Sequence, residues 1–142
     1  MRFSAIVGLA VTLFAITACA VENEDTLQAK RQAAESAEAW LALVDAQDYE
    51  KSWEEASGYF KSAVPKDEWQ RGMQAARKPL GEIISRKLKK QQYATTLPGA
   101  PDGQYVVILY ETSLVNKKAA IETITPMLDK DGQWRVSGYY IK

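Results

Sequence analysis

The sequence of 142 residues predicts an α+β fold, in which three N-terminal helices pack on a curved four-stranded antiparallel sheet. Two observations predict it. Apolar residues recur with helical spacing up to about Pro79, whereas after Gly81 the chain is rich in Val, Ile, Thr and Tyr and alternates as strands do. Short polar stretches divide this second half into segments of strand length. Helices followed by strands, rather than alternating with them, are typical of an α+β domain.

The first helix is predicted from its starting signal and its apolar stripe. Asp25 and Gln28 form an Asp-x-x-Gln capping box, a pairing that satisfies free N–H groups at the start of a helix. The helix then runs to about Ala46. Its buried side is predicted to consist of Ala33, Ala37, Trp40, Leu41 and Val44.

Two further helices follow. Asp48 is placed to cap the second helix. The buried side of that helix would be Tyr49, Trp53, Ala56 and Phe60. Pro65 suits the first turn of the third helix, which should end before Pro79 because the residue preceding a proline resists the α conformation. The inward side of the third helix would be Trp69, Met73 and Ala76.

Four strands are predicted over residues 83–96, 104–114, 119–129 and 133–142, joined by LPGAPDG, VNKK and DKDG. One face of this meander is the more apolar, and we expect it to wrap the helices. It carries Leu88, Tyr105, Val107, Leu109, Ile124, Leu128, Trp134 and Val136. The opposite face mixes threonines with apolar residues, and exposed apolar surface of that extent favours a homodimer. Its apolar residues are Val106, Ile108, Tyr110, Ile121, Met127, Tyr139 and Ile141.

The N-terminus has the pattern of an export signal. Arg2 precedes an uncharged apolar run of about a dozen residues, which is too short to span a bilayer as a mature helix. The letters ITAC at 16–19 resemble the bacterial lipobox, in which Cys19 would be acylated and become the first mature residue. The letters ACA at 18–20 also fit an ordinary signal peptidase, which would cut before Val21. We favour the lipobox, because the one cysteine of the chain stands where the lipobox requires it.

The favoured organisation is therefore a signal peptide at 1–18, a tether at 19–25 and a cone-shaped domain at 26–142. Ala20, rather than Asp, follows the cysteine. By resemblance to lipoprotein sorting rules, this residue implies a lipid anchor on the periplasmic side of the outer membrane. Cleavage before Val21 would instead leave the protein soluble in the periplasm.

Composition excludes several classes of function. The chain has no histidine and its single cysteine is Cys19, so His-based and Cys-based catalysis is excluded downstream and we expect neither a cofactor nor a metal. Lys+Arg and Asp+Glu both number 18, without the basic excess of a nucleic-acid-binding protein. The basic segment SRKLKK at 85–90 could contact anionic lipid headgroups or cell-wall polymer. We favour the simpler interpretation that its lysines protect the sheet edge from pairing with another chain.

Turn positions set approximate pairings between the strands. They place Lys90 opposite Glu111, and Glu111 opposite Glu122. They also place Glu122 opposite Tyr140, so that a polar row crosses the helix-facing side. Two facing glutamates repel, which would raise the proton affinity of one of them unless Lys90 or Arg86 compensates. Glu111, Glu122 and Tyr140 are therefore candidate catalytic residues. The candidate ligand-binding set adds Lys90 and Arg86.

Longer stretches resemble a known family. RKPLG, SRKL, YATTLPGAPDGQYVVILYETS and ETITPMLDKDGQWRVSGYYI are similar to the domain-of-unknown-function 4019 family of exported bacterial proteins, over about Ala34 to Ile141. The order of elements and the opening AEAWLALVDAQDYEKSWEEAS resemble the wider nuclear-transport-factor-2-like superfamily. That resemblance implies a cone-shaped fold. The superfamily includes isomerases and dehydratases as well as non-catalytic binding modules, so fold alone does not fix function.

Three functions remain open. We favour an exported envelope protein that is not an enzyme and that holds a small amphipathic ligand, or an envelope protein, between sheet and helices. The alternative is a small lyase or isomerase with Glu111 or Glu122 as the base and Tyr140 as a hydrogen-bond donor. The third is a structural envelope lipoprotein that contacts cell wall or lipid headgroups.

Overall fold

A computed structural model describes residues 21–142. The predicted signal peptide and Cys19, the predicted lipidation site, lie outside the described residues. Within the described range, helices precede strands, as the sequence predicts. None of the helices in that range is long and apolar enough to cross a membrane.

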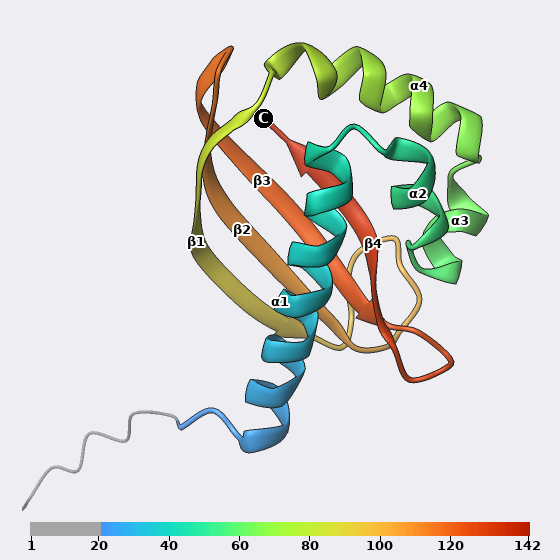
Figure 1. The fold of residues 1–142 in the computed structure, drawn as a ribbon. Coiled ribbons are helices and arrows are strands. Elements are labelled where there is room, and N and C mark those ends of the chain that lie inside the picture. Colours follow the sequence, from blue (N-terminus) through green and yellow to red (C-terminus); the bar gives the residue numbers. More distant parts are fainter. Residues whose placement is uncertain (1–20) are drawn as a thin grey trace, which may run out of the picture.

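Helix α1 (Glu24–Asp45) lies along the concave side of the sheet, and its predicted apolar stripe is buried (Figure 1). Its cap differs from the prediction: Asn23, not Asp25, accepts a hydrogen bond from the Thr26 N–H at 2.8 Å. Asparagine caps a helix as well as aspartate does. Because the helix begins earlier, Asp25 lies in the first turn, where its charge is favourable to the helix dipole.

The predicted second helix is broken into α2 (Tyr49–Glu54) and α3 (Gly58–Ala63). Ser57 causes the break. Its hydroxyl accepts a hydrogen bond from the Phe60 N–H at 3.1 Å, and its own N–H donates to the Val136 carbonyl at 2.9 Å. Ser57 therefore starts a new helix and fixes that start to the sheet.

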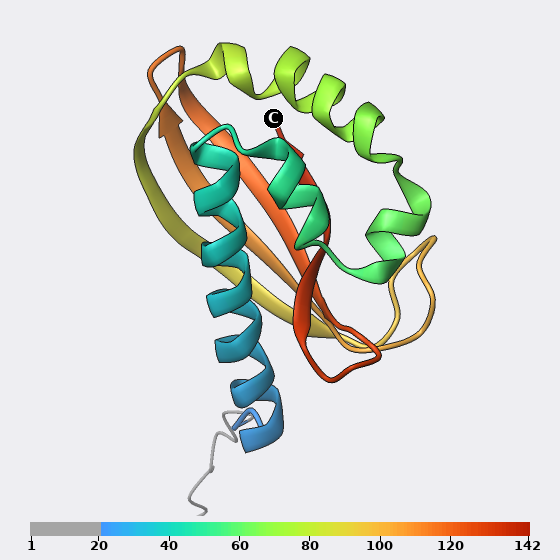
Figure 2. The same cartoon turned by 45° about the vertical axis from the view of Figure 1, so that its right-hand side comes forward.

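The predicted third helix is α4 (Lys66–Ala76), which is followed by the short 3-10 helix η1 (Lys78–Leu80). The α-helix ends before Pro79, as predicted. Figure 2 shows α2, α3 and α4 on the same side of the sheet as α1. The opposite face of the sheet is therefore not covered by any described helix.

The strands are β1 (Ile83–Ala94), β2 (Tyr105–Leu114), β3 (Lys117–Leu128) and β4 (Trp134–Ile141). They form the predicted antiparallel meander in the order β1-β2-β3-β4. Each pair of strands contains an irregularity. The register breaks lie at Ile83/Ser85 and Leu88/Lys90 in β1, Thr112/Leu114 in β2 and Thr125/Pro126 in β3.

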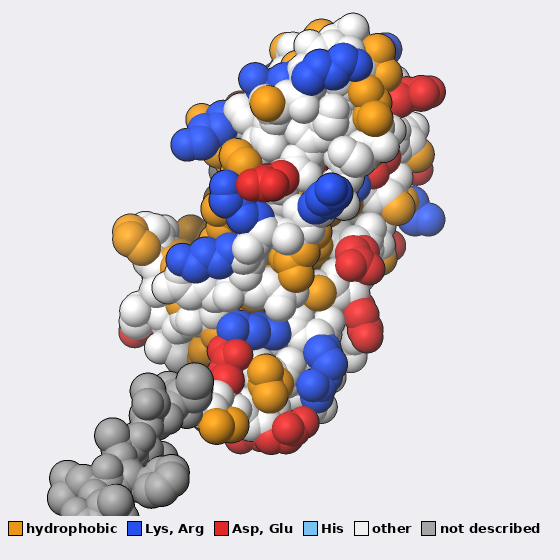
Figure 3. Space-filling model, turned by 90° about the vertical axis from the view of Figure 1, so that its left-hand side faces the viewer, with side chains coloured by type: hydrophobic (Ala, Val, Ile, Leu, Met, Phe, Trp, Pro, Cys, Tyr) orange, Lys and Arg blue, Asp and Glu red, His pale blue; other side chains and the backbone are white. Residues whose placement is uncertain are grey.

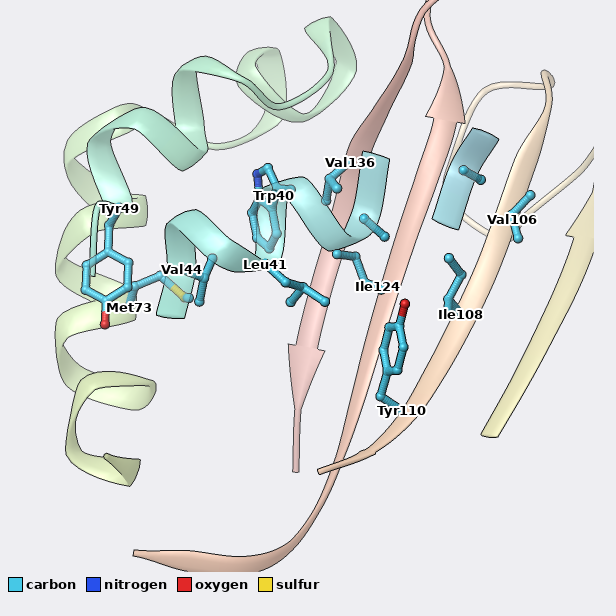
Figure 4. Packing of buried hydrophobic residues seen from close by; sticks show 12 residues of the cluster. Trp40, Leu41, Val44, Tyr49, Met73, Val106, Ile108, Tyr110, Ile124 and Val136 are labelled. Atoms are coloured by element: carbon cyan, nitrogen blue, oxygen red, sulfur yellow. The ribbon is translucent and has the colours of Figure 1, made fainter. Parts of the chain in front are cut away.

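The core lies between α1 and the concave face of the sheet (Figure 4). Trp40, Leu41 and Val44 of α1 meet Ile124 and Val136 of the sheet, and all five are at most 2% exposed. Burial of each such side chain contributes about 1.5–3 kcal/mol to folding. The space between helix and sheet is thus filled by side chains rather than left as a central cavity.

The structure corrects the predicted inner face of β2. Val107 and Leu109 lie on the outer face, whereas Val106, Ile108 and Tyr110 are buried beneath α1. The run from 106 to 110 is apolar at every position, so its alternation cannot show which set of residues faces inward.

Of the other residues predicted to face the helices, some are buried and some are exposed. Ile124 and Val136 face the core as predicted, but Leu88 is 56% exposed. The predicted dimer face is not one surface, because Val106, Ile108 and Tyr110 are buried while Ile121 and Met127 lie on the uncovered side. A homodimer stays a prediction, and it would have to use the uncovered face.

Candidate functional site

The predicted polar row does not form, because the strand pairings differ from those set by turn position. Glu111 lies opposite Lys87 rather than Lys90. Glu122 lies opposite Tyr110 rather than Glu111. The first difference spans the irregularity in β1, and the second is a slip of a single residue.

A slip of one residue turns a strand side chain to the other face of the sheet. Glu122 is buried on the concave face, at 0% exposed. Glu111 and Lys90 lie on the outer face, and Tyr140, which pairs with Thr123, is 61% exposed. The two glutamates do not face each other, so the predicted dyad is wrong.

Glu122 instead accepts four hydrogen bonds from three side chains. Arg86 donates from Nε to Oε1 at 2.8 Å and from Nη2 to Oε2 at 3.2 Å. Thr112 donates to Oε1 and Tyr139 donates to Oε2, each at 2.6 Å. Arg86 is one of the two cations that the sequence offered as a partner for the glutamates, whereas the other two donors were not foreseen.

The network continues to the end of α1. Arg86 forms a two-pronged ion pair with Asp45, at 2.8 and 2.9 Å. Arg77, at the end of α4, donates to the same carboxylate at 3.1 Å and to the Gly81 carbonyl at 2.9 Å. We call this set the Glu122 cluster; its members are Asp45, Arg77, Arg86, Thr112, Glu122 and Tyr139. It joins α1, the end of α4 and all four strands through two anions and two cations.

Charge and burial fix the protonation states in the cluster. Burial raises the pKa of the Tyr139 phenol, and the neighbouring Glu122 charge and hydrogen bond raise it further, so Tyr139 stays a donor. Burial alone would lower the pKa of the Arg86 guanidinium, but its bonds to Asp45 and Glu122 outweigh burial and raise that pKa. A carboxylate held by four donors and shielded from solvent has no free position for a substrate proton. The cluster is therefore suited to structure rather than to proton abstraction.

Within the described part of the chain, two buried polar groups lack hydrogen-bond partners, one of them in Arg77, at the α4 end of the cluster. Arg77 Nε and the hydroxyl of Tyr49 are buried without a partner among residues 21–142. Burial raises the pKa of the Tyr49 phenol, while the Arg77 charge opposes that rise. No three His, Cys, Asp or Glu side chains in the described range are placed to hold a metal ion.

A groove of about 690 Å³ opens beside β4 and is lined by polar and apolar groups. We call it the α1–β4 groove. Its walls are Gln32, Glu35, Ser36, Ala39, Trp40 and Leu43 of α1, Lys51 of α2 with the adjoining Glu55, and residues 132–135. A volume of this size fits a small organic ligand, since such sites measure about 300–1,000 Å³.

The groove has a fixed side and a free side. On the fixed side, Ser36 donates to the Trp134 carbonyl at 2.8 Å, and Trp134 donates from its indole to Gln32 at 3.2 Å. On the free side, Glu35 and Lys51 are exposed, and neither side chain bonds to another described residue. The partly buried indole and these unbonded charges can together hold a molecule with a planar or apolar part and polar groups.

Sequence reasoning found part of this arrangement. Of the predicted site residues, Glu122 and Arg86 come together, while Lys90, Glu111 and Tyr140 do not. It missed Asp45, Arg77, Thr112 and Tyr139 in the cluster. It placed Trp134, which lines the groove, on the helix-facing side of the sheet but did not name it among the site residues. A polar residue inside an apolar strand pattern, as Glu122 is, was the available signal for the cluster.

The comparisons with known proteins identify a family but no activity. A family model described as "Protein of unknown function (DUF4019)" matches residues 36–139. This range contains Arg77, Arg86, Glu122 and Tyr139. No curated protein matches the chain.

Proposed function

Because the chain belongs to the DUF4019 family, whose function is unknown, we propose one from the geometry: a non-enzymatic, envelope-anchored module that binds a small amphipathic ligand in the α1–β4 groove. We place its fold among the nuclear-transport-factor-2-like cones, since helices pack on the concave face of a single antiparallel sheet. The predicted Cys19 anchor would hold the module on the periplasmic side of the outer membrane.

The observation that carries the proposal is the saturation of Glu122. This buried carboxylate accepts four hydrogen bonds, so the predicted lyase or isomerase lacks a free base. The other predicted base, Glu111, lies on the open outer face, where nothing excludes water. A function built on binding is therefore better supported than one built on proton transfer.

The groove indicates the kind of ligand. Trp134 offers an indole face, Gln32 and Gln133 offer amides, and Glu35 and Lys51 offer charges of both signs. Such a lining suits a small molecule with an apolar or planar part and several hydrogen-bonding groups. A ligand of one strong charge would meet an equal charge of its own sign in the same groove.

Native mass spectrometry of the purified chain tests the binding function. We expect a co-purified small molecule on the wild type, reduced in Glu35→Lys and retained in Glu68→Lys, which makes the same charge change on the exposed side of α4. Retention of the molecule by both variants would show that the α1–β4 groove is not its binding site. Chemical conversion of that molecule by the wild type, abolished in Glu122→Gln, would contradict the non-enzymatic assignment.

The predicted lipid anchor at Cys19 is tested separately. Labelled palmitate added to producing cells should be incorporated into the wild type and not into Cys19→Ala. A mature chain that begins at Val21 and carries no label would show that the protein is free in the periplasm.

A further inference from the structure

The uncovered face of the sheet carries a shallow pocket of about 550 Å³ near the turn between β2 and β3. Its lining includes the apolar side chains of Ala119 and Ile121 of β3. It also includes three lysines: Lys87 of β1, Lys118 of β3 and Lys142 after β4. We call this feature the lysine pocket. It lies on the face opposite to α1 and takes no part in the α1–β4 groove.

The lysine pocket has an unbalanced positive charge. Lys87, Lys118 and Lys142 are exposed, and none of them forms an ion pair with a residue in the range 21–142. The carboxylate that lines the pocket belongs to Glu111, and it binds Lys89 at 3.0 Å. Three exposed lysines without an ion-pair partner in that range therefore line one pocket, and a bound anion would balance their charge.

An apolar band continues from the pocket along the same face. Leu109 and Val107 of β2 and Ile121 and Met127 of β3 are all half-buried without a helix above them. Tyr140 stands beside this band and is 61% exposed. Figure 3 views the molecule from the side of β1 and shows basic side chains spread over that side with hydrophobic ones between them.

Protection of the sheet edge does not by itself explain why three lysines share one pocket. Lys87 belongs to β1, an edge strand, where a lysine hinders pairing with another chain. Lys118 lies in the end of β3 that extends beyond β4, since the pairing of these two strands begins at Glu122. Edge protection requires a charge at each of these positions, but it does not require that both lysines line the same pocket as Lys142.

We infer that the uncovered face docks on an anionic lipid surface, with the lysine pocket on the headgroup phosphates. Separate exposed lysines that line a shallow, open pocket match a layer of phosphates better than one enclosed anion. The half-buried apolar band and the exposed tyrosine match the boundary between headgroups and acyl chains, where tyrosine is enriched. A lysine near such a surface strengthens binding about fivefold.

Vesicle sedimentation tests the inference with the full chain in a Cys19→Ala background, so that acylation does not contribute. The probes are vesicles of equal parts phosphatidylglycerol and phosphatidylcholine, and vesicles of phosphatidylcholine alone. The test variant is Lys87→Gln with Lys118→Gln. The matched control is Lys78→Gln with Lys130→Gln, which removes the same charge from exposed positions outside the pocket.

We expect the parent chain to prefer anionic over neutral vesicles, and the test variant to lose about 25-fold of that preference, at fivefold per lysine. The control should keep it. Each single pocket variant should lose about fivefold, which preserves the test if the double variant fails to fold. Added salt should weaken the preference, since the Debye length falls from about 10 Å at 0.1 M to about 3 Å at 1 M.

Four results would overturn the inference. The control could lose as much as the test variant, which would show a non-specific charge effect. The parent chain could bind neutral and anionic vesicles alike. It could also bind a soluble polyanion such as polyglutamate and no vesicle, or form a dimer through the uncovered face that leaves no surface for lipid; light scattering of the same samples detects the dimer.

Discussion

The inner and outer faces of the sheet each carry a glutamate paired with a cation, but the two pairs differ in burial and in hydrogen bonding. On the inner face, Glu122 is 0% exposed and accepts four hydrogen bonds, two of them from Arg86. On the outer face, the Glu111 and Lys89 side chains are 58% and 50% exposed. The comparison shows that residue type alone does not identify a functional site. The inner pair stabilises the fold, whereas the charged side chains of the outer face remain accessible to a ligand.

The largest expected effect separates the two pairs directly. Arg86→Met leaves the buried Glu122 and the adjoining Asp45 without their shared cation, and breaking a buried pair in this way costs about 3–5 kcal/mol. Lys89→Met removes an exposed partner of Glu111, worth about 0–1 kcal/mol. Urea unfolding of the two variants measures both free energies. Similar losses in the two would show that burial does not distinguish the faces.

Two tyrosines next to each other in the sequence sharpen the comparison. Tyr139→Phe keeps the ring contact with Trp40, at 5.4 Å between centroids, but removes the shorter of the two hydrogen bonds to Glu122 Oε2 and leaves that oxygen with Arg86 Nη2 at 3.2 Å. A hydrogen bond to a charged group contributes about 1.5–3 kcal/mol, so we expect a loss of that size in the free energy of unfolding. Tyr140→Phe, on the exposed side, should change it by less than about 0.5 kcal/mol. Equal effects would mean that the phenol of Tyr139 is not needed by the cluster.

The sequence was sufficient for the parts of the fold that depend on local patterns. The stripe of α1 and the order of the strands follow from periodicity and from turn residues, and both are confirmed. The inner face of β2 could not be predicted, because the run from 106 to 110 is apolar on both sides. The pairings were missed by one to three residues, since irregularities such as that between Leu88 and Lys90 leave no mark in the sequence.

The candidate site was less predictable than the fold because it depends on long-range contacts. Asp45 and Arg86 lie 41 residues apart, and Arg86 and Glu122 lie 36 apart. Each contact needs a correct strand register and a correct position for the end of α1. An error of one residue in either moves a side chain to the wrong face, as it did for Tyr140. A single buried acid could be suspected from the pattern, but its partners could not be named.

The smallest expected effect concerns the turn between β3 and β4, which borders the α1–β4 groove. Arg135 binds Asp131 through two hydrogen bonds, at 2.7 and 2.8 Å, and this pairing lowers the pKa of the Asp131 carboxyl from 3.8 to about 2. A carboxyl whose pKa is lowered by folding stabilises the protein above its unfolded pKa, and that contribution is lost as the pH falls through the folded value. The wild type should therefore lose more thermal stability than Asp131→Asn between about pH 4 and pH 2.

Because Asp131 is exposed, the difference should be small, and Asp102→Asn in the turn between β1 and β2 should behave like the wild type. Melting curves that run parallel for wild type and Asp131→Asn across this range would show that Arg135 does not hold the turn through that carboxylate.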